Sequence, residues 1–130
     1  MDNNIDIKNL KLKKVLYVED DVAIMNSCMR ILNKLFAEVI TAQNGEEGLD
    51  AFKLNKDVSF VITDIKMPKM DGLDMAEEIK KINSDIPCIL TTAHGEYDYF
   101  LRAEEIGIYR YIQKPLNINE LITALSDYKE

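Results

Sequence analysis

The chain has 130 residues, of which 47% are hydrophobic and 30% charged, values typical of a single globular domain. With 16 basic and 23 acidic residues the formal net charge is −7, and no basic stripe stands out, so we expect no direct binding to nucleic acid. No apolar run approaches the roughly 20 residues of a membrane span, and the first residues lack the features of a signal peptide, so we expect a cytoplasmic protein with no membrane partner.

Residues 1–13 show no clear period, and we interpret them as an N-terminal leader, with one domain at residues 14–130. The periodicity that follows alternates between extended and helical segments. In chain order it predicts a strand at 14–18, a helix at 22–36, a strand at 39–41, a helix at 44–55, a strand at 60–63, a helix at 73–82, a strand at 87–91, a helix at 97–106, a strand at 111–113 and a helix from 117 onward.

Local signals mark several of these boundaries. Asn44 and Asn117 are each followed three residues later by an acid, Glu47 and Glu120, which is the pattern of an N-cap. Gly107 is expected to end the helix at 97–106.

Five short, nearly all-apolar strands that alternate with five helices predict a parallel sheet covered on both faces, a doubly wound α/β architecture. Cys28 and Cys88 lie in apolar stretches, and we interpret both as small core residues rather than as a disulfide or a metal set.

Polar side chains follow the strands where each one ends. Glu19 and Asp20 come after the first strand, Asp64 after the third, Thr92 after the fourth and Lys114 after the fifth. In an open parallel sheet, ligands bind outside the carboxyl ends of the strands, near the point where the strand order switches. The sequence therefore predicts one polar site at this edge.

The residue types at this edge indicate phosphoryl chemistry. The carboxylates of Glu19, Asp20 and Asp64 repel one another unless a hard divalent cation neutralises them, and oxygen-only ligands favour Mg²⁺. A carboxylate can attack phosphorus directly, which makes Asp64 the candidate nucleophile. The Lys114 ammonium and the Thr92 hydroxyl would complete a clamp on the phosphoryl oxygens.

At this point the chain resembles the bacterial two-component response-regulator receiver family, from about Lys14 to Tyr128. The segments that carry the resemblance are VLYVEDD (15–21), TDIKMPKMDG (63–72), LTTA (90–93) and YIQKP (111–115). The resemblance implies a flavodoxin-like receiver fold with strand order 2-1-3-4-5.

For the site, the resemblance implies that Asp64 is the phosphoacceptor. Asp20, Asp64 and the backbone carbonyl of Lys66 are then direct Mg²⁺ ligands, with Glu19 acting mainly through water. Lys114 is expected to pair with the phosphate.

The resemblance also implies a switch, in which Thr92 moves toward the phosphate and the rotamer of Tyr111 changes with it. Lys66 and His94, two residues after Asp64 and Thr92, are then expected to tune the lifetime of the acyl phosphate. The peptide bond before Pro115 is expected to be cis, as in much of the family.

The expected function is a phosphorylation-dependent signalling switch that is not an enzyme beyond assisting its own phosphorylation and dephosphorylation. The donor is expected to be a sensor histidine kinase or a phosphotransfer protein. The surface of the fourth helix, fifth strand and fifth helix would then control a downstream protein or output domain, or form a dimer. Aromatic residues crowd this region, at Tyr97, Tyr99, Phe100, Tyr109 and Tyr111, and ordinary packing explains most of them equally well.

Two other functions share parts of the pattern. A haloacid-dehalogenase-like phosphotransferase also uses a strand-end Asp nucleophile with Mg²⁺, but it needs a second acid two residues later, where this chain has Lys66. A flavodoxin-like electron carrier needs a hydroxyl-rich loop after the first strand, whereas here that loop is acidic and would repel a cofactor phosphate. The residues leave open whether the receiver stands alone or precedes an output domain.

Overall fold

A computed structural model describes residues 7–93, 95 and 97–129, and it confirms the predicted doubly wound α/β architecture. The strands are β1 (Lys14–Val18), β2 (Glu38–Ala42), β3 (Phe60–Asp64), β4 (Cys88–Thr92) and β5 (Arg110–Gln113). The helices are α1 (Val22–Leu35), α2 (Gly45–Leu54), α3 (Gly72–Ile82), α4 (Phe100–Ile106) and α5 (Ile118–Asp127), preceded by a 3₁₀ helix, η1 (Ile7–Leu12). The strands pair in parallel in the order β2-β1-β3-β4-β5, which is the predicted order.

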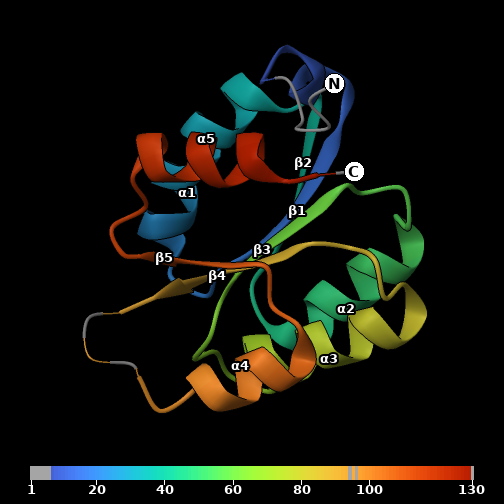
Figure 1. Cartoon of the computed structure of the whole chain (residues 1–130), viewed down its shortest axis with the longest axis vertical. Coiled ribbons are helices and arrows are strands. Elements are labelled where there is room, and N and C mark those ends of the chain that lie inside the picture. Colours follow the sequence, from blue (N-terminus) through green and yellow to red (C-terminus); the bar gives the residue numbers. More distant parts are fainter. Residues whose placement is uncertain (1–6, 94, 96, 130) are drawn as a thin grey trace.

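The helices cover both faces of the sheet (Figure 1). α1 and α5 lie on one face, and α2, α3 and α4 lie on the other. Each face has its own apolar cluster, with Phe60 and Leu121 in the first and Val61 and Ile79 in the second. Burial on both faces explains why β3, all five of whose residues are buried, reads as a continuous apolar run.

Part of the predicted leader is folded. Residues Ile7–Leu12 form η1, and the Leu10 side chain is fully buried in the cluster beneath α1 and α5. The boundary at residue 14 stays a prediction, but the structure packs these six residues against the domain.

The helix starts follow the local signals. The Asn44 side chain accepts a hydrogen bond from the Glu47 backbone N–H at 2.9 Å and donates one to the Glu47 carboxylate at 2.7 Å, which confirms the predicted cap. Asn117 likewise accepts from the Glu120 backbone N–H at 3.1 Å. Gly107 ends α4 in the left-handed conformation, at φ 89°, as expected.

α4 is shorter than predicted, because it begins at Phe100 and not at Tyr97. A turn bond from the Phe100 N–H to the Tyr97 carbonyl comes first, and the first bond of helical spacing runs from the Ala103 N–H to the Tyr99 carbonyl. Tyr99 occupies the N-cap position without a side-chain cap, so nothing local extends the helix toward its N-terminus.

Cys28 and Cys88 are both buried and free, which confirms them as core residues. None of the helices in the described part of the chain is long and apolar enough to cross a membrane. The peptide bond between Lys114 and Pro115 is cis, as the resemblance implied.

Candidate functional site

The site forms where the strand order reverses. β1 and β3 are neighbours in the sheet, but the chain leaves β1 into α1 on one face and leaves β3 toward α3 on the other. Where neighbouring strands diverge in this way, their carboxyl ends are the usual ligand position in such sheets. Glu19 and Asp20 directly follow β1, and Asp64 ends β3.

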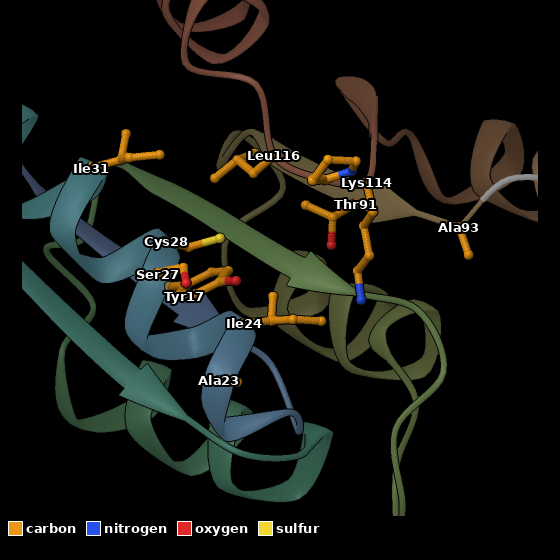
Figure 2. Close-up of a pocket in the computed structure, with 11 residues that line it drawn as sticks. Tyr17, Ala23, Ile24, Ser27, Cys28, Ile31, Thr91, Ala93, Lys114 and Leu116 are labelled. Carbon is orange, nitrogen blue, oxygen red and sulfur yellow. The ribbon is translucent and has the colours of Figure 1, made fainter.

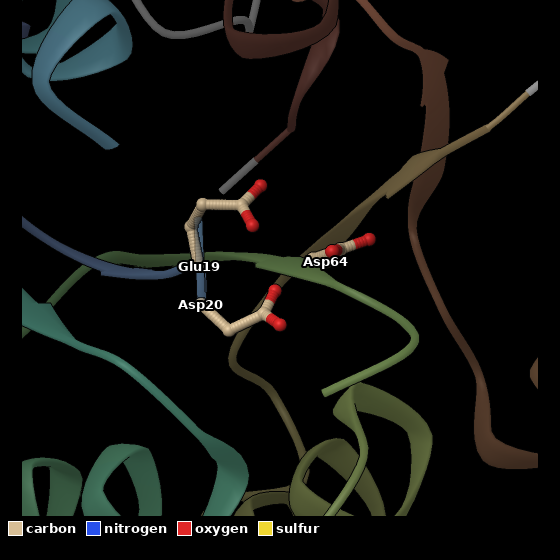
Figure 3. Close-up of side chains that lie close together, drawn as sticks. All are labelled: Glu19, Asp20 and Asp64. Carbon is tan, nitrogen blue, oxygen red and sulfur yellow. The ribbon is translucent and has the colours of Figure 1, made fainter. Parts of the chain in front are cut away.

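Glu19, Asp20 and Asp64 come together as the sequence predicted (Figure 3). One carboxylate oxygen of each lies within 4.8 Å of the others. Glu19 and Asp64 are buried, with 1% and 6% of their surface exposed, whereas Asp20 is exposed. The cluster therefore combines two buried acids with one exposed acid.

Lys114, at the end of β5, bridges the two buried acids. Its Nζ lies 2.9 Å from Asp64 Oδ2 and 3.0 Å from Glu19 Oε1. Burial lowers the pKa of Lys114, but the hydrogen bonds to Asp64 and Glu19 outweigh it and hold this pKa above its usual value. For Glu19, burial and then the nearby Asp64 charge raise the pKa, and the bonds from Asp21 and Lys114 only partly oppose them.

Backbone groups fix the orientation of Asp64. The Ile65 N–H donates to Asp64 Oδ1 at 2.8 Å, which leaves Oδ2 for Lys114. The Thr63 hydroxyl donates to the Asp64 carbonyl oxygen at 2.8 Å. Hydrogen bonds thus fix both the carboxylate and the main-chain carbonyl of Asp64.

Two contacts at the site were not predicted from the sequence. Gly72 lies so close that a Cβ added to it would be 2.0 Å from the Asp64 carbonyl oxygen, so this position requires glycine for close approach. Asp21, the third acid of the run after β1, caps α1 by accepting from the Ile24 N–H at 3.1 Å. The spacing of Asp21 ahead of the helical pattern was the available signal for that role.

Thr92 and Tyr111 lie near the site on adjacent strands. Thr92 is buried, and its carbonyl accepts from the Lys114 N–H at 2.7 Å. Leu90 and Tyr111 are register partners, so the side chains of Thr92 and Tyr111 lie on the same face of the sheet. The Tyr111 ring centroid is 5.1 Å from that of Phe100 in α4.

Lys66 extends from the loop after β3 and is exposed. Its Nζ lies 5.8 Å from the ring centroid of Tyr99, a contact that the sequence did not predict. His94, the other residue expected to tune the phosphoryl lifetime, lies outside the described residues. The lifetime roles of both stay predictions.

A cavity of about 500 Å³ adjoins the site on the α1 side (Figure 2). It is lined mainly by apolar side chains, among them Ile24 and Ile31 of α1 and Leu116 after β5. Its polar lining residues include Ser27, Thr91 and Lys114. An apolar surface therefore lies directly beside the ammonium group that contacts Asp64.

Taken together, the geometry suits a divalent cation and an anionic tetrahedral group. Three carboxylates supply hard oxygen ligands, and Lys114 supplies a positive charge next to the Asp64 carboxylate, which the Ile65 N–H orients.

Comparison with known proteins agrees with this chemistry. The model of the response regulator receiver domain family matches residues 15–126. The chain is 38% identical over 109 residues to a probable transcriptional regulator, ycf27, of Cyanophora paradoxa, covering 84% of this chain and 45% of that protein. It is 31% identical over 116 residues to the sporulation initiation phosphotransferase F of Bacillus subtilis, covering 89% and 93% respectively. The chain thus spans less than half the length of the transcriptional regulators it matches.

Solved structures show the same fold. A response regulator receiver domain protein of Clostridium thermocellum superposes with a TM-score of 0.81 at 36% identity, over 87% of this chain and 90% of that one. The CheX-CheY-BeF3-Mg complex of Borrelia burgdorferi gives a TM-score of 0.79 at 27% identity, over 86% and 85%. The chain belongs to the response-regulator receiver domain family of two-component signalling.

Proposed function

We propose that this receiver domain is a phosphorylation-dependent switch in which Asp64 accepts a phosphoryl group from a sensor histidine kinase or a phosphotransfer protein. The observation that carries the proposal is the position of the Lys114 ammonium, which lies 2.9 Å from Asp64 and 3.0 Å from Glu19 at the carboxyl ends of β1 and β3. A cation held against the candidate nucleophile is what a transferring phosphoryl group requires.

In the proposed reaction the phosphoryl group passes directly from the donor to Asp64, and no further reactant is needed. One Asp64 carboxylate oxygen forms a bond to phosphorus as the bond between phosphorus and the donor imidazole nitrogen breaks, and the electron pair of that bond stays on the imidazole. Lys114, which neutralises Asp64 and Glu19 beforehand, then pairs with the phosphoryl oxygens. The chain acts only on itself in this step, so we do not propose an enzyme activity on external substrates.

Mg²⁺ fits the donor set of this site. Asp20, Asp64 and the backbone carbonyl of Lys66 would hold the cation, and Glu19 would act through water. The bound cation would neutralise charge on the phosphoryl oxygens. Support comes from the three carboxylate oxygens within 4.8 Å of one another and from the Borrelia CheY complex, which contains BeF3 and Mg.

The donor is proposed to approach over the α1 side of the site. The 500 Å³ cavity beside Lys114 is lined by Ile24, Ile31 and Leu116, so it suits apolar side chains of a protein rather than a polar small molecule. A cytoplasmic setting is part of the proposal and agrees with two cysteines that are free thiols.

The output is proposed to be the surface of α4, β5 and α5. Phosphate on Asp64 would attract the Thr92 hydroxyl, and Tyr111, on the same face of the sheet, would follow. On this surface Phe100 packs against Tyr111 and Leu101 is 82% exposed, which offers an apolar contact to a downstream protein, an output domain or a second copy of the chain. Tyr109 is a packing residue instead, because its hydroxyl donates to the Ala124 carbonyl at 2.7 Å.

The test is phosphorylation by radiolabelled acetyl phosphate with Mg²⁺. Asp64→Asn should abolish labelling, and chelation of Mg²⁺ should do the same in the wild-type protein. Asp57→Asn is the matched control and should label normally, because Asp57 is an exposed acid paired at 2.8 Å with Lys14, at the opposite end of β1 from Glu19 and Asp20. Stoichiometric labelling of Asp64→Asn would place the acceptor elsewhere and overturn the proposal.

The haloacid-dehalogenase-like alternative requires an acid two residues after the nucleophile. This chain has Lys66 there, and the Lys66 ammonium contacts the Tyr99 ring. A basic group in this position cannot protonate a leaving alcohol as a carboxylic acid does.

A further inference from the structure

The ammonium group of Lys66 lies over the ring of Tyr99, 5.8 Å from its centroid, within the range of a cation–π contact. Lys66 is two residues after Asp64, whereas Tyr99 directly precedes α4. The contact therefore joins the loop after β3 to the start of α4.

The Tyr99 ring is a fixed platform for this flexible lysine. It packs against the buried cluster that contains Ile65, Leu90 and Ala103. Its carbonyl accepts the first helical hydrogen bond of α4, from the Ala103 N–H at 2.9 Å. The position of the ring is thus tied to α4, while Lys66 has only its own exposed side chain to rearrange.

We propose that Tyr99 is a positioning residue that holds the Lys66 ammonium away from Asp64 and so shortens the lifetime of the phosphoryl group there. The inference rests on the proposed function of Asp64. It adds a residue from a different element, whose ring competes with the phosphoryl group for one ammonium.

The competition follows from charge. In the unphosphorylated protein the Asp64 carboxylate already has Lys114 at 2.9 Å, and the Lys66 ammonium contacts Tyr99. Phosphorylation adds negative charge two residues from Lys66, and this charge competes with the ring for the ammonium. In the phosphorylated protein Lys66 is then shared between the ring and the phosphoryl oxygens.

An ammonium on the phosphoryl oxygens slows hydrolysis. In hydrolysis a water oxygen bonds to phosphorus as the bond from phosphorus to the Asp64 oxygen breaks, the electron pair returns to the carboxylate, and inorganic phosphate leaves with the protons of the water. Lys66 at the phosphoryl group obstructs the approach of that water. Removing the competing ring therefore lengthens the phosphoryl lifetime.

The first experiment measures the decay of labelled Asp64 in the presence of Mg²⁺. Tyr99→Leu should slow decay about two- to fivefold, the factor that an exposed cation–π contact supports. Tyr99→Phe keeps the ring face and should restore the wild-type rate. Tyr97→Leu is the matched control, because the Tyr97 ring contacts Phe100, at 5.6 Å between centroids, and its loss should leave the rate unchanged.

A double-mutant comparison separates this role from a general structural one. In a Lys66→Met background, Tyr99→Leu should have no effect on the decay rate. Unchanged or faster decay in Tyr99→Leu, or equal slowing with and without Lys66, would overturn the inference. Circular dichroism of each variant establishes that it is folded.

A second measurement does not depend on phosphorylation. The aromatic ring should shift the NMR signals of the Lys66 Cε protons upfield in the wild-type protein and in Tyr99→Phe, but not in Tyr99→Leu, and beryllofluoride with Mg²⁺ should reduce the shift without removing it. If Asp64 does not label, the proposed function fails and this inference falls with it. If Asp64 labels but the Lys66 signals show no ring shift, only this inference fails.

Discussion

Neutralising Asp64 should stabilise the domain while it abolishes phosphorylation. Asp64→Asn keeps the size of the side chain and an oxygen for the Ile65 N–H, but it removes one charge from a site that holds three carboxylates and one ammonium. The sign of the effect depends on whether repulsion by Glu19 and Asp20 outweighs attraction by Lys114.

The distances between the charged groups allow the repulsion and the attraction on Asp64 to be compared. Carboxylate oxygens 4.8 Å apart repel by about 3.5 kcal/mol at an effective dielectric constant of about 20, so Glu19 and Asp20 each act on Asp64 with at least that energy. Lys114 at 2.9 Å attracts Asp64 by about 6 kcal/mol on the same scale. Repulsion therefore exceeds attraction by about 1 kcal/mol, and burial of the Asp64 charge adds to the cost.

Urea unfolding followed by circular dichroism measures this difference. We expect Asp64→Asn to raise the free energy of unfolding by about 1 kcal/mol at low salt. Asp57→Asn, which removes an exposed partner of Lys14, is the matched control and should lower it by about 0–1 kcal/mol.

The same urea unfolding is then repeated in the presence of Mg²⁺. At a tenfold excess over its Kd, Mg²⁺ should add about 1.4 kcal/mol to the wild-type protein and markedly less to Asp64→Asn. The reasoning fails if Asp64→Asn is less stable than the wild type without Mg²⁺, or if Mg²⁺ stabilises both proteins equally.

Two further predictions concern the packing around the site and the core. Gly72→Ala should lower the free energy of unfolding by about 1–3 kcal/mol, because the new Cβ meets the Asp64 backbone. Gly48→Ala meets side-chain atoms only, the sulfur of Met75 and the methyl groups of Val18, and should cost less; equal costs by urea unfolding would contradict this. Burial raises the pKa of the Cys88 thiol to about 11, so the unfolded chain loses this proton first, and stability should fall by about 1.4 kcal/mol per pH unit between about pH 9 and about pH 11. Cys88→Ala should lack this part of the pH dependence, and identical slopes would refute the assignment.

The sequence was sufficient for those parts of the fold that depend on local chemistry. Apolar runs buried on both faces identified the strands, and their sheet-edge position brought Asp64 and Lys114 together as expected. The N-caps at Asn44 and Asn117 were also predictable from the sequence, because an N-cap hydrogen bond spans only three residues.

Features that depend on tertiary contacts could not be predicted in this way. The close approach of Gly72 to Asp64 is set by how α3 returns to β3, and the contact of Lys66 with Tyr99 joins residues 33 positions apart in the sequence. The predicted start of α4 was three residues too early, because the aromatic residues Tyr97 and Tyr99 continue an apolar pattern but supply no side-chain cap. Pattern alone does not distinguish a helix from the turn that leads into it.

The acidic run after β1 illustrates how the fold separates neighbouring residues of the same chemistry. Glu19 is buried against Lys114, Asp20 stays exposed at the edge of the cluster, and Asp21 caps α1. The chain passes from extended to helical backbone within these three residues, so their side chains cannot share one direction. Only two of the three acids therefore remain to face Asp64, and a third would add to a repulsion that the single ammonium of Lys114 already fails to offset. The cap at Asp21 thus stabilises α1 and at the same time keeps the charge of the cluster within what one lysine and one divalent cation can neutralise.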